Sequence, residues 1–291
     1  MRLLLQLLVN GVAAGGVFAL FTVGFALVYN TTRIFHVAHG AVFTVAAYAT
    51  YAGARLLHLP LVAAAVAATG VAVLLGLAIE AWAYRPLRRR GAGLGALMIG
   101  SFGVSIVLQS VIGLLFGAQE QTVRSDPLPS LVVAGVQITG LHAAVLALCA
   151  VLFTLLQLFL TRTATGNQIR AVADNPELAA LVGIDPGRLY LVIGALGAGL
   201  AGLAAPLTAL DTGIALGNGF SVLLLGAVAT IVGGVGHLPG AGLAAFGLGI
   251  VQNLSVYVLS PQWQDAVVFV VLGVFLIARP QGLFGELLRR S

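Results

Sequence analysis

The chain has 291 residues, of which 60% are hydrophobic and only 8% are charged, whereas an ordinary soluble domain carries about a quarter charged residues. This composition excludes a soluble fold, and no polar stretch is long enough to form a domain outside the membrane. The formal net charge is +5 and all fourteen cationic residues are arginine. The chain therefore lacks the lysine that a phosphate-binding P-loop or Schiff-base chemistry requires.

The single cysteine, Cys149, lies inside an apolar segment, which excludes an internal disulfide and a cysteine-based metal site. The arginines are scattered along the chain instead of being gathered on one face, so nucleic acid is not an expected partner. We expect no cofactor and no bound metal.

Nine apolar stretches are long enough, or nearly long enough, to cross a bilayer as helices of about twenty residues. They lie at 4–29, 38–57, 61–83, 94–117, 139–161, 188–210, 219–235, 241–260 and 264–279. The seventh and ninth are short, and Gly213, Gly217 and Gly219 are placed to break a helix. The sequence predicts an all-α, polytopic membrane bundle formed by residues 1–291 as a single domain. It has nine spans, or eight spans plus a re-entrant segment within 211–235.

Arginine positions predict the orientation, because positive residues in short loops stay on the cytoplasmic side. With nine spans, one set of loops holds Arg33, Arg85, Arg88, Arg89, Arg90, Arg162, Arg170, Arg188, Arg279, Arg289 and Arg290. The opposite set holds Arg2, Arg55 and Arg124. The N-terminus should therefore lie outside and the C-terminus in the cytoplasm, with Arg88, Arg89 and Arg90 anchored near anionic headgroups.

Ionisable residues are expected only near the ends of the spans. Glu80, for example, lies close to the end of the third span. This pattern argues against proton coupling, which needs ionisable groups inside the membrane, although sodium can still be bound by backbone carbonyls. Small residues recur every four positions at Gly11, Gly15 and Ala19 and again at Gly194, Ala198 and Gly202. Such ridges predict close helix packing.

The longest inside loop, about 162–188, has the sequence signals of a short amphipathic helix. Asn175 can cap it, Pro176 suits its first position and Glu177 suits its positive end. Leu178, Leu181 and Val182 then share one face, and Gly183 is placed to end the helix. A helix on the membrane surface usually carries basic residues and aromatic anchors, which this one lacks. We therefore expect it to dock into a groove of a partner protein.

Four motifs in this chain resemble those of the branched-chain amino acid ABC permease family. They are VAHGAVFTVAAY at 37–48, IRAVADNPELAALVGID at 169–185, GGVGHLPGA at 233–241 and RPQGLFG at 279–285. Together they span nearly the whole chain, and the second and fourth are the most specific. Compared with the family pattern, His36 and Val37 replace an Asn-Phe pair, and Ala244 and Ala245 replace a Gly pair.

The resemblance implies a permease subunit of an ATP-driven importer for branched-chain amino acids or related small amino acids and amides. The resemblance also implies which residues couple the permease to an ATPase: Arg170, Ala171, Asp174, Asn175, Pro176, Glu177 and Gly183. The predicted apolar face adds Leu178 and Leu181 to this set. The implied partners are a homologous second permease, two ATP-binding subunits and an extracytoplasmic substrate-binding protein. The implied location is the bacterial cell (inner) membrane, with ATP hydrolysed by the partners and no enzymatic activity in this chain.

Two further groups are candidates for an inner gate or an inner turn. His39 and Gly40 begin the second span, where the histidine is either near a gate or a helix-end cap. The third motif, which begins at Gly233, is expected to form a tight turn in which Gly234 and Gly236 permit positive φ angles. Pro239 and Gly240 are expected to start the eighth span.

Two other classes of transporter fit the composition. One is a stand-alone channel for small neutral solutes, and the other is a sodium-coupled carrier, but neither requires a shaped cytoplasmic docking helix. A membrane-embedded enzyme would require a cluster of reactive side chains, which the sequence does not suggest. The substrate-binding residues, and whether the second permease is identical or only related, stay open.

Overall fold

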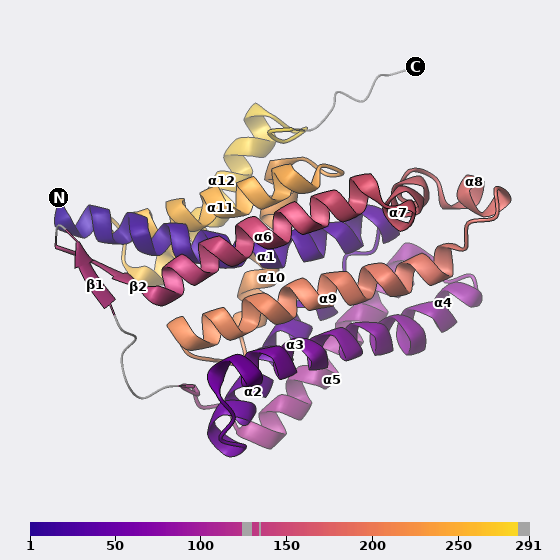
Figure 1. Ribbon diagram of the computed structural model, residues 1–291. Helices are drawn as coiled ribbons and strands as arrows, with labels where there is room; N and C mark the ends of the chain where they lie inside the picture. The colour runs from indigo at the N-terminus through magenta and orange to yellow at the C-terminus, as the bar shows by residue number, and fades with distance from the viewer. Residues whose placement is uncertain (124–129, 134, 285–291) are drawn as a thin grey trace. The chain divides into compact units, whose positions relative to one another are not determined.

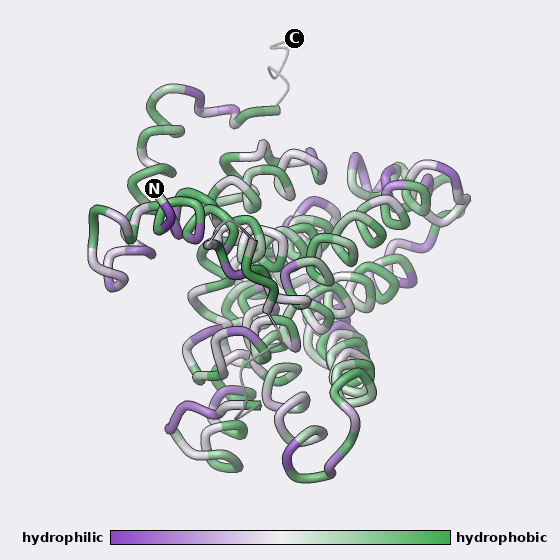
Figure 2. The backbone as a smooth tube through the Cα atoms, turned by 60° about the vertical axis from the view of Figure 1, so that its left-hand side comes forward, coloured by the Kyte–Doolittle hydropathy of each residue, from purple (hydrophilic) through white to green (hydrophobic). Residues whose placement is uncertain are grey.

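The computed structural model describes residues 1–123, 130–133 and 135–284, and this part of the chain is mostly helical (Figure 1). Hydrophilic residues gather at the ends of helices and in the connections between them (Figure 2). Four residues named above lie outside the described part: Arg124, Gly285, Arg289 and Arg290.

The first of two compact units comprises Met1–Ala26, Arg124–Cys149 and Ser221–Ser291. Its elements are most of α1 (Arg2–Thr32), β1 (Ser130–Val133), β2 (Val136–Thr139), the start of α6 (Gly140–Arg162), most of α10 (Asn218–Gly233), α11 (Leu238–Ser255), the 3-10 turn η3 (Pro261–Trp263) and α12 (Gln264–Ala278). The two strands form an antiparallel hairpin in which Ser130 pairs with Thr139.

Close approach between helices holds the first unit together, because lipid provides no hydrophobic force between apolar helices. Helix α1 lies so close to α11 at Gly15 that an added Cβ would meet the backbone of Phe246. The same helix contacts α6, where the Cys149 thiol donates a hydrogen bond to the Gly16 carbonyl at 3.1 Å. The small-residue ridge predicted on α1 is thus confirmed as a packing surface.

The second unit comprises Leu27–Val123 and Ala150–Phe220. Its elements are the end of α1, α2 (Ala38–Tyr51), the π-helical turn η1 (Ala52–Leu56), α3 (Leu61–Ala78), the π-helical turn η2 (Ile79–Tyr84), α4 (Arg85–Arg89), α5 (Leu94–Phe116), the rest of α6, α7 (Ala164–Asp174), α8 (Pro176–Leu181), α9 (Pro186–Asp211) and the first turn of α10. Helix α2 contacts α3, α5 and α9, and α3 also contacts α9 (Figure 1).

Helices α3 and α9 pack through the second predicted ridge. The Ala198 side chain lies against Gly76, and at Gly202 an added Cβ would meet the Ala72 side chain and the backbone of Thr69. The Thr69 hydroxyl donates to the Gly202 carbonyl at 3.0 Å, so the close approach also supplies a polar contact between the helices. This ridge is confirmed as well.

Six helices in the described part of the chain are long and apolar enough to cross a membrane, as expected for a multi-pass membrane protein. They are Arg2–Thr32, Leu61–Arg89, Leu94–Phe116, Gly140–Arg162, Pro186–Asp211 and Pro261–Ala278. Helix α10 has 16 residues, fewer than the roughly twenty that a 30 Å hydrocarbon core requires. Every stretch proposed as a span contains a helix, while the number of crossings stays a prediction.

Two features differ from what the sequence pattern predicts. The chain forms a hairpin at 130–139, where a Gly135 φ of 80° permits the turn between segments that contain β-branched residues, which favour strands. The third helix continues through η2 and α4 to Arg89 instead of ending near residue 83. Glu80 therefore lies inside a continuous helical stretch, not at its end.

The close packing of α3 and α9 predicts opposite effects for two Gly→Ala substitutions. Gly202→Ala should lower the free energy of unfolding by about 1–3 kcal/mol, because the helices must move apart. Gly70→Ala on α3, where no atom lies within 4 Å of the added Cβ, should leave stability unchanged or raise it by up to about 1 kcal/mol. Thermal unfolding of the purified variants measures the difference, and equal shifts would contradict the packing described here.

Candidate functional site

Helix α7 follows α6 after a single residue, Thr163, which caps it. The Thr163 hydroxyl accepts a hydrogen bond from the Gly166 backbone N–H at 3.0 Å, which satisfies one of the free donors at the helix start. Ile169 and Val172 are buried, so one face of α7 is fixed to the second unit. The other face is exposed.

Helix α8 is a short, rigidly capped element with an exposed apolar face. The Asn175 side-chain oxygen accepts hydrogen bonds from the backbone N–H groups of Glu177 and Leu178, both at 3.0 Å. Exposed fractions are 59% for Leu178, 83% for Leu181 and 76% for Val182. Apolar side chains exposed together in this way often mark an interaction surface.

The sequence-predicted coupling residues all lie on α7, on α8 or in the turns beside them. Ala171 is half-buried, and the exposed members are Arg170, Asp174, Asn175, Pro176, Glu177, Leu178, Leu181 and Gly183. Gly183 has a φ of 87°, which explains why glycine follows the helix. The local structure read from the sequence is therefore confirmed for this segment, which we call the coupling segment (164–185).

The coupling segment is joined to the second unit at both of its ends. At the end of α7, the Arg33 guanidinium donates to the Ala173 carbonyl at 3.4 Å, where a cation is favoured by the helix dipole. After α8, the Asp185 carboxylate accepts from the Gly187 N–H at 2.9 Å and caps α9. Figure 1 shows α7, α8, α4 and the start of α9 at the same end of the second unit.

A buried ion pair lies beside the first turns of α9. The Arg88 guanidinium of α4 pairs with the Glu80 carboxylate of η2, and their side chains are 22% and 6% exposed. The same guanidinium lies over the ring of Tyr190 on α9, 4.4 Å from its centroid. Such a cation–π contact stabilises a charge that is held away from water.

Hydrogen bonds extend this polar group to the loop between α1 and α2. Tyr84, whose ring also lies near Arg88, has its hydroxyl 2.5 Å from His36 Nδ1. Ser101 of α5 accepts from the Ala38 N–H at 2.9 Å. Burial, together with nearby His39, lowers the pKa of His36 well below its ordinary value, so the neutral His36 ring can accept a hydrogen bond from the Tyr84 hydroxyl. We call Glu80, Arg88, Tyr190, Tyr84 and His36 the polar cluster.

The polar cluster corrects the expectation for Arg88. Its guanidinium pairs with Glu80 instead of being exposed to headgroups, whereas Arg89 and Arg90 are exposed. The sequence does contain a signal for this pair. Glu80 and Arg88 are eight residues apart, which spans about two turns of helix and puts them on one face once the helix is known to continue.

His39 and Gly40 lie in the second unit at the start of α2. His39 is fully buried, with its ring 5.6 Å from that of His36, and is therefore not at an exposed helix end. Gly40 lies beneath the first turn of α10, where an added Cβ on Gly219 would meet the Gly40 carbonyl and the Thr44 hydroxyl.

The glycine turn at 233–240 lies in the first unit and meets the fourth motif. Gly234 and Gly236 have φ angles of 101° and 97°, as expected from the sequence. His237 Nδ1 accepts from the Gly240 N–H at 2.9 Å and caps α11. The ring of Phe284 stacks on His237 at 5.2 Å, and its backbone N–H donates to the Gly233 carbonyl at 3.3 Å. The third and fourth motifs thus form one turn structure.

Within the described residues, no group of three or more His, Cys, Asp or Glu side chains is arranged to hold a metal ion.

The chain matches the family described as "Branched-chain amino acid transport system / permease component" over residues 7–276. It is 31% identical to the high-affinity branched-chain amino acid transport system permease protein BraD of Pseudomonas aeruginosa, with 97% of this chain and 96% of BraD covered. It is 30% identical to the corresponding protein LivH of Escherichia coli, again with 97% and 96% covered.

A more distant relative is the probable branched-chain amino acid transport permease protein LivH of Methanocaldococcus jannaschii, at 26% identity over 96% of this chain and 92% of that one. A solved structure, PsaBC from Streptococcus pneumoniae in complex with Fab, aligns with a TM-score of 0.51 at 15% identity, covering 97% of this chain and 94% of that chain. That likeness concerns the fold alone. On the family match and the identity to BraD, the chain belongs to the branched-chain amino acid ABC transporter permease family.

Proposed function

We propose that this chain is the transmembrane subunit of an ATP-driven importer for branched-chain amino acids or related small amino acids and amides. It performs no covalent chemistry, and its partners are a homologous second permease, two ATP-binding subunits and an extracytoplasmic binding protein. The names of BraD and LivH support the substrate class. The binding protein sets most of the specificity.

In the proposed topology the chain crosses the bacterial inner membrane nine times, with its N-terminus outside and its C-terminus in the cytoplasm. The coupling segment then faces the cytoplasm, where ATP is available. The arginine distribution supports this orientation, since most arginines fall in the loops assigned to the cytoplasm.

The observation that carries the proposal is the exposed apolar face of α8. The side chains of Leu178, Leu181 and Val182 are mostly exposed, yet the Asn175 cap holds their helix in a defined shape. Burying one such side chain stabilises a complex by about 1.5–3 kcal/mol. We infer that these residues fill a groove of the ATP-binding subunit.

Movement of α8 is passed to the bundle through its two connections. One leads through the Asp185 cap into α9 and from Tyr190 to the Arg88–Glu80 pair. The other leads through the end of α7 to Arg33. Because the Glu80 carboxylate is buried and the Arg88 side chain is mostly covered, separating them is costly. Helix α9 and the η2–α4 segment therefore move together when the ATP-binding subunit pulls on α8.

Leu181→Asp should weaken binding of the ATP-binding subunit by about tenfold or more, because a charge replaces a buried apolar contact. Leu57→Asp is the matched control, since Leu57 is 69% exposed but lies at the end of the second span that is assigned to the opposite side. Binding is measured by titrating the purified ATP-binding subunit onto each variant in nanodiscs. Equal affinities for both variants, or concentrative uptake by the chain without any ATPase, would refute the proposal.

Arg88→Gln or Glu80→Gln alone should destabilise the chain by about 3–5 kcal/mol, because each leaves a buried charge without its partner. The double variant should unfold at a higher temperature than either single variant. In variants that still fold, uptake should fall while binding of the ATP-binding subunit persists. Arg90→Gln serves as the control because Arg90 is exposed. Additive effects on unfolding, or uptake at the normal rate in all variants, would contradict a role for the pair.

A further inference from the structure

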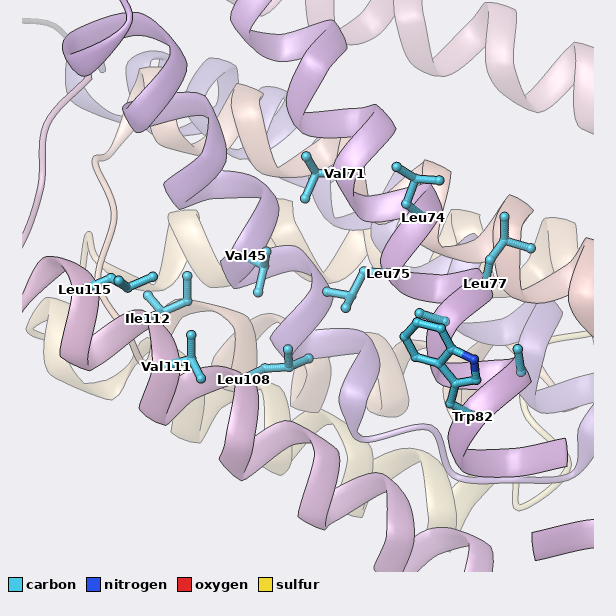
Figure 3. A pocket seen from close by; sticks show the side chains of 12 residues that line it. Val45, Val71, Leu74, Leu75, Leu77, Trp82, Leu108, Val111, Ile112 and Leu115 are labelled. Atoms are coloured by element: carbon cyan, nitrogen blue, oxygen red, sulfur yellow. The ribbon is translucent and has the colours of Figure 1, made fainter. Parts of the chain in front are cut away.

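An open apolar groove of about 750 Å³ lies on the second unit, between α2, α3 and α5 (Figure 3). Val71, Leu74 and Leu75 of α3, Val45 of α2, and Leu108 and Ile112 of α5 contribute to its lining. Trp82 of η2 lines one end and is 82% exposed. The volume falls within the range of ligand-binding pockets, about 300–1,000 Å³.

Two exposed arginines follow Trp82 in the chain, beyond the residues that line the groove. Arg85 and Arg89 follow Trp82 by three and seven residues, which puts them on the same side of the helical stretch. Both are exposed, and neither forms an ion pair with any described residue. Arg88 differs from these two arginines because its guanidinium forms an ion pair with Glu80. The site therefore combines an apolar groove with two guanidinium groups that form no ion pair with the described residues.

The α3–η2 side of the groove, from Val71 to Trp82, is about as long as one leaflet of a bilayer is thick, and the α5 side continues to Leu115. Val71 and Trp82 are eleven residues apart, which corresponds to about 16 Å along a helix. Half of a 30 Å hydrocarbon core is about 15 Å. Tryptophan is typical of the boundary between the hydrocarbon and the headgroups, so Trp82 indicates the depth at which the groove meets the headgroup region.

We propose that this groove binds one acyl chain of an anionic phospholipid whose phosphate is held by Arg85 and Arg89. Basic residues at the cytoplasmic ends of transmembrane helices bind anionic headgroups in this way. An apolar helix of a partner protein would fill the groove but leave both arginines without counter-charges. The occupant is therefore a lipid of the cytoplasmic leaflet, which rests on the orientation given under the proposed function.

Tryptophan fluorescence tests the site directly, because the chain contains only Trp82 and Trp263. The full chain carrying Trp263→Phe is reconstituted into phosphatidylcholine vesicles that contain brominated phosphatidylglycerol or brominated phosphatidylcholine. Bromine quenches Trp82 when a brominated chain occupies the groove. We expect brominated phosphatidylglycerol to reach half-maximal quenching at a mole fraction at least about fivefold lower than brominated phosphatidylcholine does. This factor corresponds to the attraction of one arginine for an anionic surface.

Arg85→Gln combined with Arg89→Gln should abolish the preference for phosphatidylglycerol, whereas the control Arg162→Gln, an exposed arginine at the end of α6, should retain it. Ala78→Phe, which fills the groove lining, should reduce quenching by both lipids. Equal quenching by the two lipids in the parent chain, or a preference that survives loss of both arginines, would overturn the proposal.

Native mass spectrometry of the assembled transporter decides whether a partner protein covers the groove instead. The complex released from membranes containing phosphatidylglycerol should retain one more such lipid than the complex carrying Arg85→Gln and Arg89→Gln. Equal retention would assign the groove to a protein and overturn the lipid proposal. Neither measurement uses ATP or a side-specific membrane, so failure of the importer proposal would be seen separately, in the uptake assays.

Discussion

The whole structure depends on the weakness of hydrophobic association inside a lipid bilayer. Helices surrounded by lipid tails gain little by burying leucine, so they are held by close backbone approach and a few polar contacts. This constraint explains the ridges at Gly15 and at Ala198–Gly202. It also explains why the Thr69–Gly202 and Cys149–Gly16 hydrogen bonds occur where helices come closest. The second unit concentrates its buried charge in the polar cluster, beside the coupling segment.

That arrangement gives the coupling segment two different surfaces with two different roles. Ile169 and Val172 fix α7 to its own chain, whereas Leu178 and Leu181 face outward on a helix too short to be stable by itself. Caps at both helix starts, together with the buried Ala179 of α8, define the shape of the exposed part. A rigid, exposed apolar element joined to buried polar contacts is well suited to receive force from another protein and pass it into a bundle.

Local signals in the sequence were sufficient for some features and not for others. Capping by Asn175, the positive φ angles at Gly234 and Gly236 and the small-residue ridges follow from short-range chemistry, and the structure confirms them. Hydropathy does not predict the Glu80–Arg88 pair, because hydropathy falls where charges begin even though the helix itself continues. The contact of Phe284 with His237 joins two residues that are more than forty positions apart in the chain, and no local pattern specifies such a contact.

The proposed function requires that an ATP-hydrolysing protein in the cytoplasm binds α8. Its most direct test is thiol labelling of Leu181→Cys in a Cys149→Ser background, where serine keeps a hydrogen-bond donor to Gly16 and removes the one native thiol. We expect a membrane-impermeant maleimide to label residue 181 only from the cytoplasmic side, and the bound ATP-binding subunit to block the labelling. Labelling from the external side, or labelling that is unaffected by the ATP-binding subunit, would contradict the proposed function.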